Sequence, residues 1–416
     1  MKNFELYNPV KVVFGQGESD RIGEIVCSLG KTAMVVSYEE HHFLDGLLEK
    51  IKEQLLQNGI RTVMFYKVKA NPHLSDVLEA VEICKREQVE FCIGVGGGSV
   101  MDSTKVIAAG VKYSGKIWDM FVSRHDRVIG IPPKETLPTV MVPTLPATSS
   151  ETNCITVVTN DETCEKAYVS TPVIYPTISI VDPLLTCTLP VGQTAIGAVD
   201  AMSHVLEAYL NGDQNSPLQD RLNEALLITI MSELRKIMKN PTDADSRANL
   251  QWAISLSWNG YLHSGLNATT PMHQMGHVLS ARYNTPHGIT LAIFIDSYFR
   301  YTSVLNEERE KRFALLGEKV FGILGDDQRE AAKKTVQRFI DFMDEVGVIH
   351  TLTDAGTPCE DIDQIADEIV MDMRIPLKRA AESMKNANKT GSKILGFVEL
   401  FKHKEDSVCG SLKKKI

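Results

Sequence analysis

The stretch Glu-Phe-Cys-Ile-Gly-Val-Gly-Gly-Gly-Ser at residues 90–99 decides the fold of the first half of the chain. Its first part, residues 90–95, is a short apolar run that favours a buried strand. Three glycines follow at once, and a helical period continues from Ser99 to residue 111. A strand, a glycine turn and a helix in this order are typical of an open parallel sheet, which binds phosphates at the carboxyl ends of its strands.

The same alternation of short strand-like runs and helical runs surrounds this stretch. Gly59 ends one of the helical runs, as a helix C-terminus requires. The order βαβαβα predicts a parallel sheet with helices on both faces. We expect strands at residues 32–37, 61–66, 90–95, 137–142, 154–158 and 177–181, and helices at residues 43–58, 74–88 and 99–111.

The pattern changes after Asp182 and Pro183. From Val191 onward the chain carries long helical periods and almost no strand pattern. We therefore predict an α/β domain over residues 1–187 and an all-helical domain over residues 188–416. The clearest helical periods lie at residues 218–238, 244–261, 307–321 and 330–345.

Gly96, Gly97 and Gly98 have a phosphate-binding and a purely structural interpretation. In the first, backbone N–H groups and the helix dipole face an anion, which the glycines allow to approach closely. Ser99 then caps the helix, with Asp102 three residues on as in a capping box. The stretch misses the dinucleotide fingerprint, which needs a glycine at position 99, and also the P-loop pattern. In the second interpretation the glycines form a tight turn without a ligand.

A carboxylate and several imidazoles in the second half indicate a metal site. Asp200 and His204 lie one turn apart on one helix face, and His273 and His277 repeat this spacing. His287 follows in a turn-like break. These ligand types suit iron, zinc and other first-row divalent metals. The spacing leaves open whether His273 and His277 are a ligand pair.

The alternative is a surface ion pair, because an acid and a histidine one turn apart are common neighbours on helices. Residues 196–210 are largely apolar or small, which indicates that Asp200 and His204 point inward. Buried charges are normally paired or bound to metal. We therefore interpret these residues as one mononuclear metal site between helices.

Composition excludes several classes of protein. The chain has 416 residues, of which 43% are hydrophobic and 23% charged, and its formal net charge is −9. The chain has no extended basic block of the kind that binds nucleic acid. It has no apolar run long enough to span a membrane. We also expect no secretory leader. Eight scattered cysteines form no Cys-x-x-Cys pair, which predicts free thiols in a reducing, cytoplasmic setting.

Taken in order, these motifs resemble the iron-containing, or group III, alcohol dehydrogenases, the family of lactaldehyde reductase and the NAD(P)-dependent butanol dehydrogenases. The resemblance covers nearly the whole chain, and it implies a Rossmann-like dinucleotide-binding domain followed by an all-α metal-binding domain. Residues 8–15 are similar to the family's N-terminal hairpin. Residues 96–102 are similar to its first cofactor loop, and residues 144–151 to its second cofactor loop, called the second loop below. Its metal signatures are matched by residues 200–204, 273–277 and 284–288.

The resemblance implies a role for each site residue. Asp200, His204, His273 and His287 bind one divalent metal, ferrous iron first and zinc as the alternative. His277 then lies beside the metal, near substrate and nicotinamide, where it relays a proton or only supports its neighbours. The implied cofactor contacts come from both loops and their surroundings: Asn71, Gly96, Gly97, Gly98, Ser99, Asp102, Thr144, Thr148 and Lys166.

The stretch Ser37-Tyr38-Glu39-Glu40 departs from the glycine-rich sequence of many relatives that use NADPH. We expect Ser37 and Glu39 near the adenine ribose, where an acidic side chain accepts hydrogen bonds from a 2′-hydroxyl and repels a 2′-phosphate. This favours NAD over NADP. If Glu39 and Glu40 turn to solvent, the preference is open.

The resemblance implies hydride transfer between NAD(P)(H) and a small primary alcohol or aldehyde, carried out by a homodimer. The alternative is a lyase like dehydroquinate synthase, which also uses NAD and a metal but needs a cluster of Lys and Arg at the substrate end. Residues 252–266 and 294–301 offer only His263 and Arg300 as basic anchors. A metal-dependent hydrolase is a third possibility, but it would not explain the glycine loop or Asp102.

Overall fold

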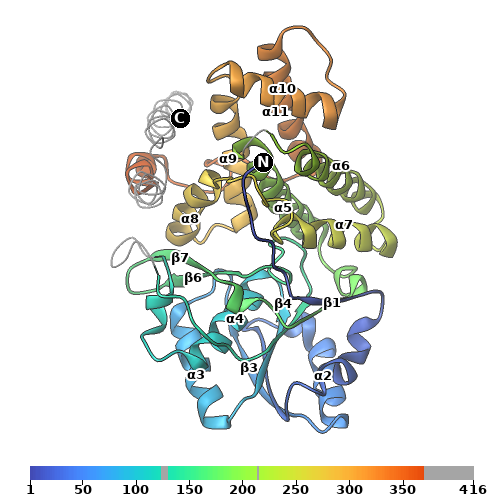
Figure 1. Cartoon of the computed structure of the whole chain (residues 1–416), viewed down its shortest axis with the longest axis vertical. Helices are drawn as coiled ribbons and strands as arrows, with labels where there is room; N and C mark the ends of the chain where they lie inside the picture. The colour runs from blue at the N-terminus through green and yellow to red at the C-terminus, as the bar shows by residue number, and fades with distance from the viewer. Residues whose placement is uncertain (123–129, 213–214, 370–416) are drawn as a thin grey trace, which may run out of the picture.

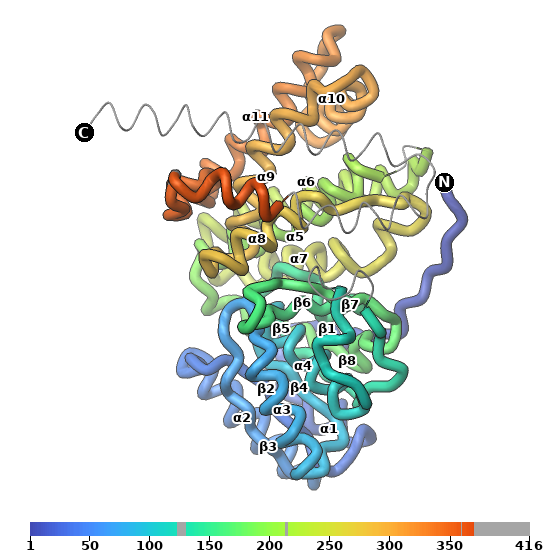
Figure 2. Tube along the Cα trace, turned by 90° about the vertical axis from the view of Figure 1, so that its left-hand side faces the viewer, coloured from blue at the N-terminus to red at the C-terminus, as the bar shows by residue number. Residues whose placement is uncertain are grey.

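The computed structural model describes residues 1–122, 130–212 and 215–369. Figure 1 shows two lobes, of which the lower contains the strands and the upper consists of helices. The first residues run along the side of the molecule towards the helical lobe (Figure 2), where the backbone N–H of Lys2 donates to the carbonyl of Gly265. No helix within the described ranges is long and apolar enough to cross a membrane.

The lower lobe is built on a six-stranded sheet in which all neighbouring strands are parallel, in the order β1-β8-β5-β4-β2-β3. The parallel sheet and the helical second lobe confirm the predicted fold class. The strands are β1 (Lys11–Phe14), β2 (Thr32–Tyr38), β3 (Arg61–Val68), β4 (Phe91–Gly96), β5 (Thr139–Pro143) and β8 (Ile178–Val181).

Helices cover both faces of this sheet. Ala33 and Val35 of β2 pack with α1 and α2, whereas Met34 and Val36 pack on the opposite face with α3 and α4. Because all four side chains are buried, the strand has no polar alternation, as expected in a sheet covered on both faces. The helices are α1 (Ile22–Val26), α2 (Asp45–Gln57), α3 (Leu74–Glu87) and α4 (Gly98–Lys112), with the short 3₁₀ helices η1 (Glu18–Arg21), η2 (His42–Leu44), η3 (Ile117–Met120), η4 (Pro172–Ile174) and η5 (Pro183–Thr186).

Two segments differ from expectation. Residues 154–158 do lie in a strand, β6 (Ile155–Asn160), but it pairs antiparallel with β7 (Glu165–Ser170) in a hairpin outside the parallel sheet. The sequence pattern misses β7 because charged residues begin it. Residues 8–15 do not form a hairpin, because β1 lies parallel to β8 at the sheet edge.

The upper lobe surrounds one central helix, α5 (Val191–Asn211), in which every residue from 197 to 210 is buried. A helix that is covered on all sides belongs to the core, and α5 contacts α6, α7, α8, α9 and α10. The division at residue 187 remains a prediction. The surrounding helices are α6 (Pro217–Lys239), α7 (Ala244–Ser257), α8 (Pro271–Tyr283), α9 (His287–Thr302), α10 (Glu307–Phe321) and α11 (Gln328–Glu345), followed by η6 (Cys359–Asp361).

His350 joins the end of α11 to α9. Its Nδ1 lies 3.2 Å from Asp296 Oδ2, and its Nε2 lies 3.0 Å from Asp344 Oδ1. The hydrogen bond to Asp296 is the main cause that raises the pKa of His350 from 6.5 to about 9. Since the folded pKa exceeds the unfolded one, the protonated imidazole stabilises the fold fully below pH 6.5, and this stabilisation is lost as the pH rises through about 9.

We predict that His350→Gln lowers the free energy of unfolding by roughly 1–3 kcal/mol at pH 6, because hydrogen bonds to a charged group are lost. At pH 10 we expect a much smaller difference. Urea unfolding of both chains at the two pH values measures it, and an equal loss at both would contradict the ion pairs.

Candidate active site

Three metal-ligating side chains converge between the central helix and α8. Asp200 and His204 lie one turn apart on α5, and His273 lies in the first turn of α8. One ligand atom from each of the three lies within 4.8 Å of the others. His287, the first residue of α9, lies beside them, with its Nε2 3.7 Å from Asp200 Oδ1.

The buried atoms of this cluster fit a divalent cation. Both carboxylate oxygens of Asp200 and the Nε2 of His273 are buried without a hydrogen-bond partner. A buried charge without a partner is costly, and a carboxylate with imidazoles is a donor set that first-row divalent metals prefer. The donor set therefore supports the predicted metal site, although the assignment of its four ligands remains a prediction.

Burial sets the charge of these groups in the absence of a cation. It raises the pKa of Asp200 to about 6 and holds the pKa of His204 and of His287 well below the usual 6.5. The imidazoles are therefore neutral near pH 7, which is the form that ligates a metal.

Glu207 is a site residue that the sequence analysis missed. It lies on the same face of α5, one turn beyond His204, and its side chain is fully buried. One carboxylate oxygen hydrogen-bonds the Nδ1 of His273, and the other accepts the backbone N–H of Met272 at 2.6 Å. A carboxylate on one ring nitrogen of a histidine fixes the other nitrogen as the ligand atom. The sequence could have indicated Glu207, because positions 200, 204 and 207 share one face of an apolar helix.

His277 lies one turn after His273, beside the three-residue cluster. Its ring centre is 5.6 Å from that of His287. Burial, followed by the charge of Lys166, holds its pKa well below 6.5. A neutral imidazole at this place can accept a proton, but its proposed role stays a prediction.

Trp258 forms a wall of the metal cluster. Its ring centre lies 4.9 Å from that of His204 and 5.6 Å from that of His273. The ring of His263 packs against the tryptophan at 4.1 Å, and its Nε2 is buried without a partner. Aromatic rings therefore line this side of the cluster.

The glycine turn packs tightly against its neighbours. A Cβ atom at Gly98 would lie 2.6 Å from a side-chain carbon of Thr148, and one at Gly97 would lie 2.8 Å from the hydroxyl of Tyr38. That hydroxyl accepts the backbone N–H of Gly97 at 2.8 Å. A side chain at either position would therefore require a neighbour to move. The cap of α4 is Gly97, without a side-chain hydrogen bond, so Ser99 does not cap the helix as expected.

Asp102 joins α4 to the second loop instead of completing a capping box. Its carboxylate accepts the Ser150 hydroxyl at 2.6 Å and the backbone N–H of Val157 at 2.8 Å. The fully buried Lys105 adds hydrogen bonds to Ser150 and Asn153. These bonds hold the loop in place beside the glycine turn.

The second loop also reaches the helical lobe. Thr144 donates its backbone N–H to the carbonyl of Gly96, while the hydroxyl of Thr152 and the carboxylate of Glu151 hydrogen-bond Ser255 at the end of α7. The loop therefore spans from the glycine turn to the lobe that carries the metal cluster.

Lys166 links the two parts of the site. Its Nζ donates to Asn71 Oδ1 at 2.9 Å, and Asn71 in turn donates to Asn284 Oδ1 at 2.7 Å, just ahead of His287. Burial lowers the pKa of Lys166 to about 8, against the opposing charges of Asp102 and Asp200. Its ammonium group is thus influenced by carboxylates from both lobes.

The residues expected near the adenine ribose differ in exposure. The hydroxyl of Ser37 is buried and donates to the carbonyl of Val95 at 2.9 Å, so it ties β2 to β4. Glu39, at the carboxyl end of β2, is exposed, as is Glu40. Their predicted contacts with the cofactor remain untested.

A sheet with a glycine turn at its carboxyl edge, joined to a buried carboxylate–imidazole cluster, is the arrangement expected of an enzyme that uses a dinucleotide and a metal. Two family models match the chain, iron-containing alcohol dehydrogenase over residues 9–183 and the C-terminal domain of that family over residues 194–387. The chain therefore belongs to the iron-containing alcohol dehydrogenase family.

Characterised relatives and solved structures agree with this family. The chain is 34% identical to NADH-dependent butanol dehydrogenase A of Clostridium acetobutylicum (89% of this chain, 93% of the relative) and 32% identical to the NADPH-dependent aldehyde reductase YqhD of Escherichia coli (86% and 90%). The crystal structure of NADH-dependent butanol dehydrogenase A from Thermotoga maritima matches with a TM-score of 0.86 at 36% identity, over 96% of this chain and 99% of that one. The chain is accordingly an alcohol dehydrogenase or aldehyde reductase that uses NAD(P) and a metal.

We predict that His204→Ala and His287→Ala each reduce the metal retained per chain at least tenfold, because each removes a ligand. Metal content after gel filtration measures the loss, and circular dichroism checks that the helices remain. Full retention in both variants would contradict the site.

We further predict that Glu207→Gln weakens metal binding by roughly ten- to a hundredfold, because loss of the carboxylate partner of a ligating histidine typically has this effect. Competition with a chelator measures the dissociation constant. The control is Glu224→Gln, a buried carboxylate on α6 that accepts the Tyr209 hydroxyl at 3.0 Å away from the metal ligands. If metal affinity falls equally in both variants, Glu207 stabilises the fold rather than orienting His273, and the prediction is wrong.

Proposed function

We propose that this chain transfers hydride between NAD(H) and a small primary alcohol or aldehyde, at a metal held by Asp200, His204, His273 and His287. The observation that carries the proposal is the buried Asp200 carboxylate, which faces three imidazoles and lacks a hydrogen-bond donor. A single metal with an open position for a substrate oxygen suits carbonyl chemistry.

The metal, when bound, would polarise the substrate oxygen as a Lewis acid. Ferrous iron is our first choice, in keeping with the family, and zinc is the alternative because the same donors suit it. Glu207 holds His273 in the orientation that directs its Nε2 to the cluster. Trp258 and His263 add apolar ring surface beside the proposed metal position, which would contact the carbon chain of a small substrate.

The dinucleotide would lie along the carboxyl edge of the sheet, with its pyrophosphate on Gly96, Gly97, Gly98 and Ser99 at the N-terminus of α4. The place of this turn, between the carboxyl end of β4 and the first residue of α4, supports the assignment. Thr144, Thr148, Asp102, Asn71 and Lys166 complete the proposed contacts.

NAD is the proposed cofactor because Glu39 lies exposed at the carboxyl end of β2. A carboxylate near the adenine ribose accepts hydrogen bonds from a 2′-hydroxyl and repels a 2′-phosphate. Ser37 contributes to this segment through its bond to β4 rather than through a free hydroxyl. The names of the relatives include both cofactors.

His277 is our candidate for proton movement. Its half-buried imidazole has a pKa well below 6.5, mainly through desolvation, and it lies beside His287. It can therefore accept the proton of an alcohol and release it towards solvent, or return it to an aldehyde during reduction. The lyase alternative is not favoured, because the relatives are alcohol dehydrogenases and aldehyde reductases.

We also infer a homodimer that pairs through the sheet edge at β1. This strand has no partner on its outer side within the described sheet, and Phe14 and Tyr7 expose apolar surface beside it. Exposed edge strands with apolar side chains favour pairing with another chain. Sedimentation equilibrium of the full chain tests this inference. A cytoplasmic location likewise remains a prediction, in keeping with the free thiols at the described cysteines.

We predict that the purified chain loaded with Fe²⁺ or Zn²⁺ oxidises NADH when butanal or propanal is added, with a kcat/KM at least tenfold above that for NADPH. Glu39→Gly should narrow this ratio at least fivefold, because the repulsion of a 2′-phosphate is removed. Glu40→Gly, which changes the adjacent exposed acid, is the matched control. Absence of aldehyde-dependent oxidation with either cofactor and either metal would refute the proposed function.

A further inference from the structure

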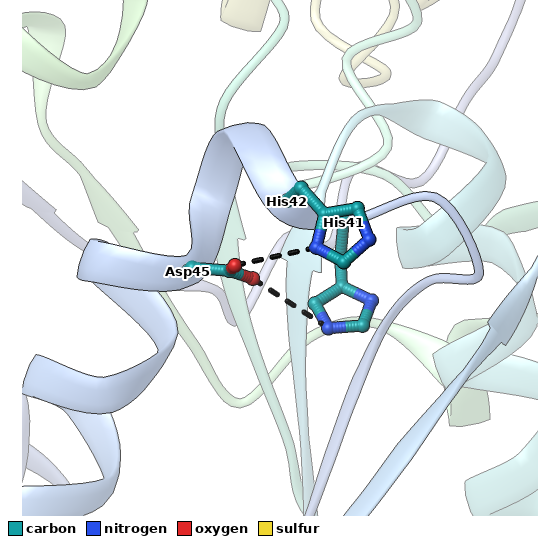
Figure 3. Close-up of side chains that lie close together, drawn as sticks. All are labelled: His41, His42 and Asp45. Atoms are coloured by element: carbon teal, nitrogen blue, oxygen red, sulfur yellow. Dashed lines mark hydrogen bonds and ion pairs between the residues drawn. The ribbon is translucent and has the colours of Figure 1, made fainter.

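A second group of side chains that could ligate a metal lies in the α/β lobe, away from the cluster around Asp200 and next to Glu39. His41 and His42 precede α2, and Asp45 is its first residue (Figure 3). One ligand atom from each of the three lies within 4.8 Å of the others. The Nε2 of His41 is 3.6 Å from Asp45 Oδ1, and the Nδ1 of His42 is 3.3 Å from Asp45 Oδ2.

A hydrogen bond determines which nitrogen of His41 is free. Its Nδ1 lies 3.1 Å from the backbone carbonyl of Glu39, which can only accept, so this nitrogen carries the hydrogen. In the neutral ring the Nε2 is then an acceptor, and it faces a carboxylate oxygen of Asp45. Two acceptors that face one another need either a proton or a metal ion between them. A backbone carbonyl on the second ring nitrogen is also the usual arrangement at metal-ligating histidines.

The surroundings hold one side of the cluster and leave the other open. The ring of His41 packs 4.4 Å from that of Tyr66, whereas the side chain of His42 is 88% exposed. Among the described residues, the ion pairs of Asp45 are with these two histidines, and no lysine or arginine neutralises it. Water can therefore complete the coordination of an ion from the open side.

The spacing of the donor atoms fits a tetrahedral ion. Zinc–nitrogen and zinc–oxygen bonds of about 2.0–2.1 Å place neighbouring ligand atoms of a tetrahedron roughly 3.3–3.4 Å apart. The His42–Asp45 separation of 3.3 Å, which is also a hydrogen-bond distance, and the His41–Asp45 separation of 3.6 Å, which runs to the other carboxylate oxygen, are compatible with a shared ion. Two imidazoles also disfavour calcium and magnesium, which prefer oxygen ligands.

We propose that His41, His42 and Asp45 form a second divalent transition-metal site, with Zn²⁺ as its representative ion. The ligand atoms are the Nε2 of His41, the Nδ1 of His42 and the carboxylate of Asp45, with water in the remaining position. The site is independent of the metal proposed at Asp200, because its ligands come from the opposite lobe.

The test is a titration of metal-free full-length chain with Zn²⁺ alone, followed by calorimetry. We expect the parent chain to bind one more Zn²⁺ than His42→Ala, and this extra site to weaken at least tenfold in His41→Phe, which keeps an aromatic ring beside Tyr66. Because His42 is almost fully exposed, its replacement leaves the fold intact.

The matched control is His73→Ala. This variant removes an imidazole that pairs with Asp161, but this pair belongs to no cluster of three ligand groups in the described ranges. We expect it to bind the same number of Zn²⁺ ions as the parent. The Asp200→Ala/His204→Ala double variant should keep the second site while losing the first. Equal stoichiometry and affinity in the parent, His42→Ala and His41→Phe would overturn the proposal.

Discussion

The active site depends on one constraint, the burial of the Asp200 carboxylate in the centre of the helical lobe. Both of its oxygens lie in the core without a hydrogen-bond donor, and a charge in this position requires an opposite charge nearby. Burial holds the pKa of His204 and of His287 well below 6.5, so these two imidazoles are neutral there and cannot supply it. The proposed divalent cation would supply this charge at the centre of the cluster, in addition to the more distant ammonium group of Lys166.

The second loop and Lys166 connect this centre to the sheet. Asp102 and Lys105 fix the loop on one side, and Ser255 fixes it on the other. Lys166 lies between them, within range of charges from both lobes. The hydrogen bonds around the glycine turn therefore extend to Ser255 of α7 and, through Lys166 and Asn71, to Asn284 in the helical lobe.

Most of the fold could be predicted from the sequence, because apolar runs and helical periods are strong where elements are buried. The parallel sheet and α10 follow from such patterns. The hairpin of β6 and β7 could not be predicted, since its pairing depends on contacts with α4 and α8. In the site, the four ligands needed the family resemblance as well as their spacing. Glu207 was missed because its partner, His273, is 66 residues away in sequence.

The central position of α5 limits which amino-acid substitutions can alter the metal or substrate preference of this enzyme. The helix carries two of the proposed metal ligands and, on its remaining sides, the packing surface for its neighbours. A substitution that adjusts metal preference on one side shifts the backbone that the other sides must fit, and close-packed interiors tolerate such shifts poorly. Variation in substrate or metal preference should therefore accumulate on the surrounding walls, such as Trp258 and His263, rather than on α5 itself.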